Sequence, residues 1–216
     1  MTEISYAITA CNEHVELDRL LEQLSKNINY SYDEIVVQLD TNATKEVKDI
    51  IEKYYLKTPM ISFKFPLNGD FAAFKNNLKD QCNKDYICFI DADELLSEDL
   101  IQDLSEILTL NPEVDLFGLC RVNNVEGITP EHIKKWGWNI DELERINYPD
   151  VQWRICKNIP EIKWRGKIHE RLIGARYEIT LPDDTILPND GYHIIHHKTI
   201  EKQEQKAPEE NKKPEE

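Results

Sequence analysis

The first half of the chain alternates between two hydrophobic periods, and this alternation restricts the folds that it can adopt. Strand-like stretches cover residues 4–10, 34–40, 60–65 and 86–90, and stretches with helical spacing cover residues 14–28, 43–55, 70–82 and 97–110. A strand followed by a helix, repeated in this way, is typical of a parallel sheet with helices on both faces. We therefore predict an α/β fold for residues 1–110.

The second half is less regular. We expect strands at residues 114–122, 151–157 and 192–197, short strands within 162–172, and a helix that Thr129 caps and Pro130 begins. From residue 201 to residue 216 the only apolar residue besides proline is one alanine, so most of this segment has nothing to bury, although its start could extend a helix. The sequence predicts one domain over residues 1–200 and a disordered tail over 201–216.

Composition restricts the classes of partner that we expect the protein to bind and the compartment in which we expect it. The 216 residues include 41 acidic and 26 basic side chains, a net charge of −15, which disfavours binding to nucleic acid or to an anionic membrane but leaves room for a local basic pocket. We find no apolar run of about 18 residues and no secretory signal, so we expect no transmembrane segment. The five cysteines are odd in number and widely spaced, which indicates free thiols and a cytoplasmic protein.

Polar side chains follow three of the predicted strands. Asn12 and Glu13 follow the first strand, Asp40 ends the second, and Asp91 and Asp93 follow the fourth. In an open α/β sheet, ligands bind beyond the carboxyl ends of the strands. Two carboxylates separated by one residue can share Mg²⁺ or Mn²⁺ together with the oxygens of a diphosphate. The alternative is a solvated turn that leads into the next helix.

Several common catalytic motifs are absent from the sequence. It contains no G-x-G-x-x-G and no P-loop, so a Rossmann dehydrogenase or a P-loop nucleotide hydrolase has no support. It also contains no G-x-S-x-G elbow and no paired C-x-x-C motifs.

The stretches ISYAITACNE, IVVQLD, DFAAFKNNLKDQCNKDYICFIDADE and IKWRGKIHERL together resemble the inverting glycosyltransferases of family 2, and the resemblance covers about residues 3–200. It implies a GT-A fold, in which a Rossmann-like, mostly parallel sheet is flanked by helices. Residues 1–110 would bind the nucleotide sugar, and residues 111–200 would form an irregular acceptor and catalytic half. The implied reaction transfers a sugar from a nucleotide-diphosphate sugar to an acceptor hydroxyl, with Mn²⁺ or Mg²⁺ as the cofactor.

The resemblance also implies which residues hold the donor. Asn12, Glu13 and Asp40 would hold the nucleoside, with Asp40 at the base or ribose. Lys75 stands where relatives with an A-x-R-N motif have arginine, and Asn76 matches the asparagine. A lysine still provides charge for a phosphate, but it lacks the bidentate fork of arginine.

The metal ligands follow from the same comparison. Asp91 and Asp93 match the D-x-D pair, and Glu94 matches its common acidic extension. His196 matches a late histidine that approaches the metal or the diphosphate in relatives. The alternative for His196 is a half-buried polar residue without a ligand.

The catalytic residues come from the second half. Inversion needs a base that removes the proton of the acceptor hydroxyl, and Glu170 is the predicted base, with His169 to orient it or to contact the donor. The alternative is a strand with one polar face. Arg154, in a stretch with Gln152 that resembles Q-x-R, would stabilise the leaving group or serve as a structural ion-pair partner. A tryptophan at 136 or 138 could stack on a sugar.

Two other functions fit parts of this pattern. A binding module without catalysis could keep the fold and the nucleotide-sugar site. A nucleotidyltransferase would also use metal-bound carboxylates, but it would carry a glycine-rich basic loop near the N-terminus, and residues 8–16 contain none.

Overall fold

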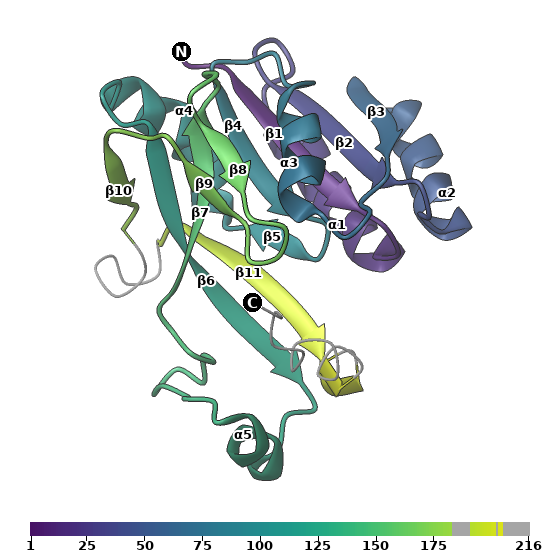
Figure 1. The fold of residues 1–216 in the computed structure, drawn as a ribbon, viewed down its shortest axis with the longest axis vertical. Helices are drawn as coiled ribbons and strands as arrows, with labels where there is room; N and C mark the ends of the chain where they lie inside the picture. Colours follow the sequence, from purple (N-terminus) through teal and green to yellow (C-terminus); the bar gives the residue numbers. More distant parts are fainter. Residues whose placement is uncertain (183–190, 202, 205–216) are drawn as a thin grey trace.

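The computed structural model describes residues 1–182, 191–201 and 203–204 and contains a nine-stranded mixed sheet flanked by helices (Figure 1). The strands lie in the order β3 (Met60–Phe65), β2 (Glu34–Asp40), β1 (Ile4–Ala10), β4 (Tyr86–Asp91), β7 (Asp150–Lys157), β6 (Leu116–Glu126), β11 (His193–Thr199) and β5 (Glu94–Leu96), with β10 (Glu178–Thr180) beside β6. Five of the eight strand pairings are parallel, which agrees with the predicted mostly parallel sheet.

The first half follows the predicted alternation closely. Its strands are β1 (Ile4–Ala10), β2 (Glu34–Asp40), β3 (Met60–Phe65) and β4 (Tyr86–Asp91), and its helices are α1 (His14–Asn27), α2 (Lys45–Tyr55), α3 (Phe71–Lys79) and α4 (Glu98–Leu110). Strands β1 to β4 pair in parallel. Apolar residues of α1, α2 and α4 pack on one face of the sheet and those of α3 on the other, so the prediction of two covered faces is confirmed.

Side-chain caps explain where several helices begin. Thr44 accepts a hydrogen bond from the backbone of Val47 at the start of α2, and Asp70 accepts one from Ala73 at the start of α3. Ser97 occupies the cap position of α4, but it makes no side-chain cap there. Its hydroxyl instead accepts from the backbone N–H of His193 at 3.2 Å, so it joins two distant segments.

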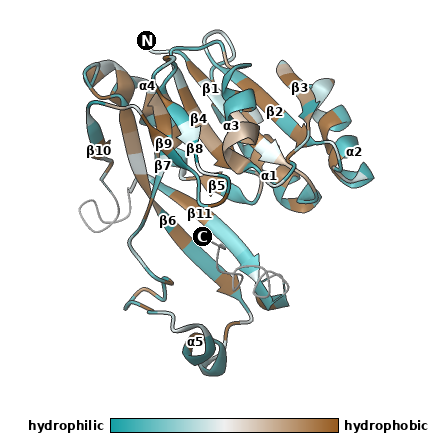
Figure 2. Ribbon diagram, in the orientation of Figure 1, coloured by the Kyte–Doolittle hydropathy of each residue, from teal (hydrophilic) through white to brown (hydrophobic). Residues whose placement is uncertain are grey.

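The second half continues the same sheet. Its main strands are β6 (Leu116–Glu126), β7 (Asp150–Lys157) and β11 (His193–Thr199), and α5 (Pro130–Trp136) follows β6 with the predicted Thr129 cap and Pro130 start. Strands β6 and β11 extend together toward α5 (Figure 1). Along this extension β6 changes from buried and hydrophobic to half-buried and hydrophilic (Figure 2).

Two short strands were not expected. Residues 94–96 form β5 (Glu94–Leu96), which pairs antiparallel with β11, and β10 (Glu178–Thr180) pairs with β6. Strand β6 also runs four residues beyond the predicted end at 122. In each case the strand is formed by partners far away in sequence, so the local pattern does not reveal it.

A separate ribbon, β8 (Lys163–Arg165) with β9 (Arg171–Ile173), lies over α3. Its inward residues Trp164 and Leu172 join the core beside α3. The Asn76 side chain donates to the carbonyl of Trp164 at 2.8 Å and accepts from its N–H at 2.9 Å. These contacts hold the loop between the two strands above the end of β4.

The remaining sequence expectations concern the cysteines, membrane segments and the tail. All five cysteines are free, and four of them are buried. No helix in the described ranges is both long enough and apolar enough to cross a membrane. The predicted tail lies outside the described residues except for 201, 203 and 204, which are helical, so its disorder stays a prediction.

Candidate active site

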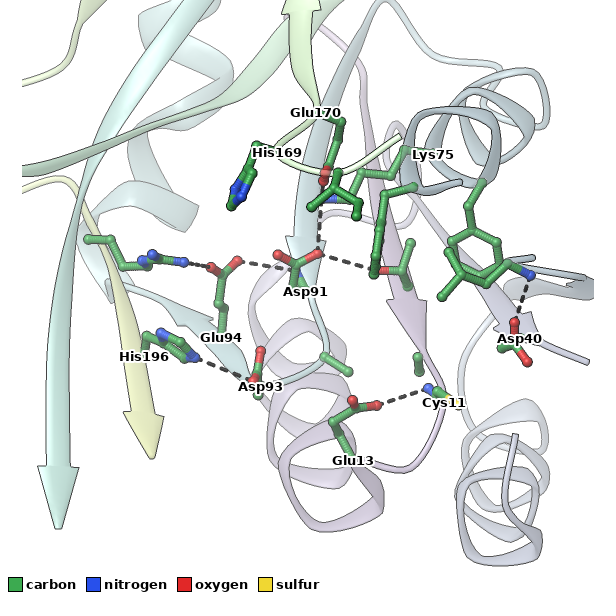
Figure 3. Close-up of a pocket in the computed structure, with 18 of the residues that line it drawn as sticks. Cys11, Glu13, Asp40, Lys75, Asp91, Asp93, Glu94, His169, Glu170 and His196 are labelled. Atoms are coloured by element: carbon green, nitrogen blue, oxygen red, sulfur yellow. Dashed lines mark hydrogen bonds and ion pairs between the residues drawn. The ribbon is translucent and has the colours of Figure 1, made fainter. Parts of the chain in front are cut away.

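A cleft of about 350 Å³ opens at the carboxyl ends of β1, β2 and β4 (Figure 3). Eight of the predicted site residues line it: Glu13, Asp40, Lys75, Asp91, Asp93, His169, Glu170 and His196. Asn12, Asn76 and Arg154 lie outside this lining. The parallel strands end at one edge of the sheet, and this brings together carboxylates that are far apart in sequence.

The acids after β1 and β2 are held by backbone N–H groups. Oε2 of Glu13 accepts from Cys11 and Asn12 at 2.9 Å each. Asp40 accepts from the N–H of Asn42 at 2.6 Å and from that of Leu67 at 2.7 Å. Each carboxylate oxygen has two lone pairs, so these acids are fixed in place and can still accept from a ligand. Asn12 itself is exposed.

Lys75 on α3 joins the predicted base to the D-x-D segment. It is only 6% exposed, and its Nζ lies 2.9 Å from Oε1 of Glu170 and 3.3 Å from Oδ1 of Asp91. The ammonium also lies 4.7 Å from the centre of the Trp164 ring, a cation–π distance. The lysine predicted to bind phosphate and the glutamate predicted to act as the base are therefore in direct contact.

Arg154 contacts two acids of the D-x-D-E stretch. Its Nη2 lies 2.7 Å from Oδ2 of Asp91 and 2.8 Å from Oε1 of Glu94, which is 1% exposed. Burial alone would raise the pKa of Asp91, but the charges of Arg154 and Lys75 outweigh it and hold that pKa well below its ordinary value. These contacts match the structural ion-pair role that the sequence left open for Arg154.

Sequence reasoning missed Arg121 and Asp150, which extend this network. Arg121 on β6 lies 3.3 Å from Oε1 of Glu94 and 2.8 Å from Oδ2 of Asp150. Charges therefore alternate in sign from Glu170 through Lys75 and Asp91 to Asp150. An arginine inside the apolar stretch LFGLCRV was the available signal, because an arginine that folding partly removes from water favours acidic partners.

His196 faces Asp93 across the cleft (Figure 3). Its Nε2 lies 3.3 Å from Oδ2 of Asp93, and its Nδ1 lies 2.9 Å from Oδ1 of Asn123. The Asn123 amide donates its Nδ2–H to Asp150 at 2.9 Å, so its oxygen must face His196 and accept the Nδ1 proton. Nε2, the other ring nitrogen, lies beside the Asp93 carboxylate, so a proton or a cation at Nε2 would be shared with Asp93.

The donor set fits a divalent cation that takes further ligands from the substrate. In the ranges that the structure describes, no three His, Cys, Asp or Glu side chains are grouped closely enough to hold a metal ion by themselves. Asp93 and His196 nevertheless present an oxygen and a nitrogen lone pair to the same space. Mg²⁺ and Mn²⁺ commonly take few protein ligands and complete their shell with phosphate oxygens and water.

Two other predictions concern His169 and the tryptophans. His169 is exposed at the rim of the cleft and has a left-handed backbone, with φ of 57°. Trp136, the last residue of α5, packs on Trp138, with ring centres 4.8 Å apart, and neither lines the cleft.

A model of the family described as glycosyl transferase family 2 matches residues 5–169. No curated protein sequence matches the chain.

The fold resembles that of solved structures of TarS from S. aureus. The complex of TarS 1–349 with UDP-GlcNAc aligns with a TM-score of 0.64 and 16% identity, over 91% of this chain and 58% of that chain. The complex with UDP aligns with a TM-score of 0.61 and 17% identity, over 92% and 60%. The chain thus spans less than two thirds of these proteins. At such identities the likeness concerns the fold, and it confirms the predicted GT-A architecture.

Proposed function

Since the chain belongs to glycosyl transferase family 2, we propose that it is a metal-dependent inverting glycosyltransferase. It would move a sugar from a nucleotide-diphosphate sugar to an acceptor hydroxyl. The observation that carries this proposal is that the strand-end acids Asp40 and Asp93 and the loop acid Glu170 line one cleft. Such a transfer requires that the carboxylates that bind the sugar donor and the base that activates the acceptor border the same cavity.

The first half of the chain would hold the donor. Asp40 would contact the base or ribose, with Asn12 and Glu13 at the nucleoside, since Asp40 and Glu13 have fixed carboxylates at the cleft. Lys75 would provide positive charge near the phosphates. TarS has been solved with UDP and UDP-GlcNAc, so uridine diphosphate sugars are the first donors to test.

The cation would be held by Asp93 and His196. Bound Mn²⁺ or Mg²⁺ would neutralise charge on the diphosphate as it leaves. Asn123 supports this role, because it fixes the tautomer that leaves Nε2 free to act as a ligand. Asp91 is paired with Arg154 and Lys75. Asp91 would therefore contribute mainly through this network.

Glu170 would act as the base. Its Oε1 meets Lys75, which leaves Oε2 to accept the proton of the acceptor hydroxyl. The hydroxyl oxygen would form a bond with the anomeric carbon while the bond from that carbon to the diphosphate oxygen breaks on the opposite face. The proton goes to Glu170, and the electron pair of the broken bond leaves with the nucleoside diphosphate. Because attack and departure take place on opposite faces, the configuration at the anomeric carbon is inverted.

A thermal-shift screen tests the proposal. A panel of nucleotide sugars, with and without Mn²⁺, should contain a donor that raises Tm only with the metal, because a ligand that binds the native state stabilises it. Transfer or hydrolysis of that donor is then measured for the wild type and Glu170→Gln. Stabilisation without turnover in the wild type would favour a binding module, and a panel without any stabilising donor would contradict the proposal.

A further inference from the structure

A second cleft, of about 560 Å³, lies beside the first and shares Glu170 with it. It is bounded by β7 and by the β8–β9 ribbon, and Lys75 and Asp91 also border both clefts. The base candidate therefore stands between two cavities. If the donor occupies the first cleft, the second is the space from which an acceptor can reach the same carboxylate.

The ribbon that borders the second cleft carries an unusual charge for this chain. Of the nine residues from 163 to 171, four are Lys or Arg and one is Glu, in a protein with a net charge of −15. The four basic residues are Lys163, Arg165, Lys167 and Arg171, and all of them are exposed. In the described part of the structure none of the four forms an ion pair. The single acid, Glu170, is already paired with Lys75.

Two of these basic residues lie directly opposite each other. Arg165 on β8 pairs in register with Arg171 on β9, and both side chains are on the outer face because Trp164 and Leu172 point into the core. Like charges in directly opposed positions of a sheet destabilise it. Folding alone does not account for this pair, whereas an anion between the two guanidinium groups would relieve the repulsion and bind in a bidentate manner.

We propose that the β8–β9 ribbon binds an acceptor that carries phosphate or carboxylate groups close to its accepting hydroxyl. This inference rests on the proposed glycosyl transfer and adds the substrate class. Arg171 directly follows Glu170 in the chain and borders the second cleft with it, so an anionic group held at Arg171 brings a neighbouring hydroxyl near the base. The acidic remainder of the protein repels anions elsewhere and favours this surface.

Binding of labelled oligosaccharides, followed by fluorescence anisotropy, tests the proposal without turnover. The probes are maltohexaose, phosphorylated maltohexaose and hexagalacturonate, which separate neutral, phosphate and carboxylate chemistry. We expect binding of one or both anionic probes, weakened by salt, and no binding of the neutral probe at the same concentration. The double substitution Arg165→Gln with Arg171→Gln should weaken anion binding about tenfold or more.

A matched control removes two exposed lysines elsewhere. Lys57→Gln with Lys134→Gln changes the net charge equally and should leave anion binding within about twofold of the wild type. Arg165→Gln alone should hold or raise Tm, since it removes a like-charge pair, whereas a merely structural arginine would lower Tm when lost.

Three results would overturn the inference. The first is equal binding of the neutral and anionic probes, and the second is an equal loss of anion binding in the two double variants. The third, from a parallel measurement with phosphatidylglycerol vesicles, is binding to the vesicles and to none of the oligosaccharides. The donor-dependent rise in Tm, measured in the same samples, reports on the first cleft. If that rise in Tm is absent, the proposed transferase function is contradicted. If the donor still binds but the anionic probes do not, only the proposed class of acceptor is contradicted.

Discussion

The ammonium of Lys75 lies between Oε1 of Glu170 at 2.9 Å and Oδ1 of Asp91 at 3.3 Å. This contact connects the β8–β9 ribbon with the end of β4 through one buried cation. Lys75 thereby holds the carboxylate of Glu170, the proposed base, beside the acid at the end of β4. Lys75 makes these two contacts at the position where relatives with an A-x-R-N motif have arginine.

Replacing Lys75 with methionine should damage both stability and turnover. The change keeps the packing against Trp164 but leaves Glu170 and Asp91 without the shared cation, and Asp91 keeps Arg154 and the hydroxyl of Thr9. We expect a loss of about 1–3 kcal/mol in the free energy of unfolding, measured by urea denaturation. Lys75→Arg, which keeps the charge, should recover most of this loss. An unchanged free energy for Lys75→Met would show that the contact is not stabilising.

Asp93→Ala should remove the metal-dependent part of donor binding and leave the fold intact. Donor dissociation constants are compared with and without Mn²⁺. If the variant keeps donor affinity that Mn²⁺ still strengthens, the assignment of Asp93 to the metal is wrong.

Asn123 offers an independent test of the same site. Its amide fixes His196 without facing the cleft as a ligand, so Asn123→Ala should weaken Mn²⁺ affinity about 10- to 100-fold, as loss of a second-layer hydrogen bond often does. The measurement is Mn²⁺ titration followed by calorimetry in the presence of the donor. Asn124, the adjacent residue on β6, supplies the control variant Asn124→Ala, for which wild-type Mn²⁺ affinity is expected.

Much of the fold and part of the site followed from local sequence. The alternation of periods over residues 1–110 predicted β1 to β4 and α1 to α4 because each period depends only on near neighbours. The acids at the ends of these strands met in one cleft because parallel strands end together. The pair Thr129-Pro130 likewise predicted the start of α5.

The remaining features depend on pairing between distant residues. Strand β5 exists because Glu94–Leu96 meets β11, about a hundred residues later, and Arg121 reaches Glu94 through the same arrangement. Asn76 looked like a donor ligand, but its amide is occupied by the backbone of Trp164. No local period encodes these contacts, so sequence reasoning found the edge of the sheet where the cleft opens and missed the residues that support it.

Asp115 should make stability depend on pH. Its carboxylate lies 2.8 Å from Nζ of Lys157 and accepts from the N–H of Arg176 at 2.9 Å. The hydrogen bond from Lys157 and then that from Arg176 lower the pKa of Asp115. A lowered folded pKa stabilises the native state above the unfolded value of about 3.9, and this contribution disappears as the pH falls through the folded pKa.

Asp115→Asn should therefore cost about 1–2 kcal/mol at pH 7, and the difference from the wild type should shrink as the pH falls below about 4. Urea denaturation at a series of pH values measures both effects. Asp49→Asn is the control, because Asp49 pairs with Lys45 on an exposed helix surface and such pairs contribute little. A difference that stays constant with pH would contradict the role assigned to Asp115.

Glu170→Gln should lower turnover far more than donor affinity. Glutamine keeps the size of the side chain and an oxygen that can accept from Lys75, so the loop and the ion network of the cleft should persist. It cannot take a proton from the acceptor, and loss of a general base typically lowers the rate by about 10²- to 10⁴-fold. Because proton removal belongs to the transition state, the dissociation constant of the donor should change little.

The measurement pairs the transfer rate with the donor dissociation constant, using the donor that the thermal screen selects. Glu161→Gln is a suitable control, since Glu161 is an exposed acid just before the same ribbon, and it should keep wild-type turnover. Near-wild-type turnover for Glu170→Gln would move the base to another carboxylate, with Glu94 the next candidate. Glu94 lines the same cleft, although it is 1% exposed and paired with Arg154. A parallel loss of donor binding would instead make Glu170 a binding residue.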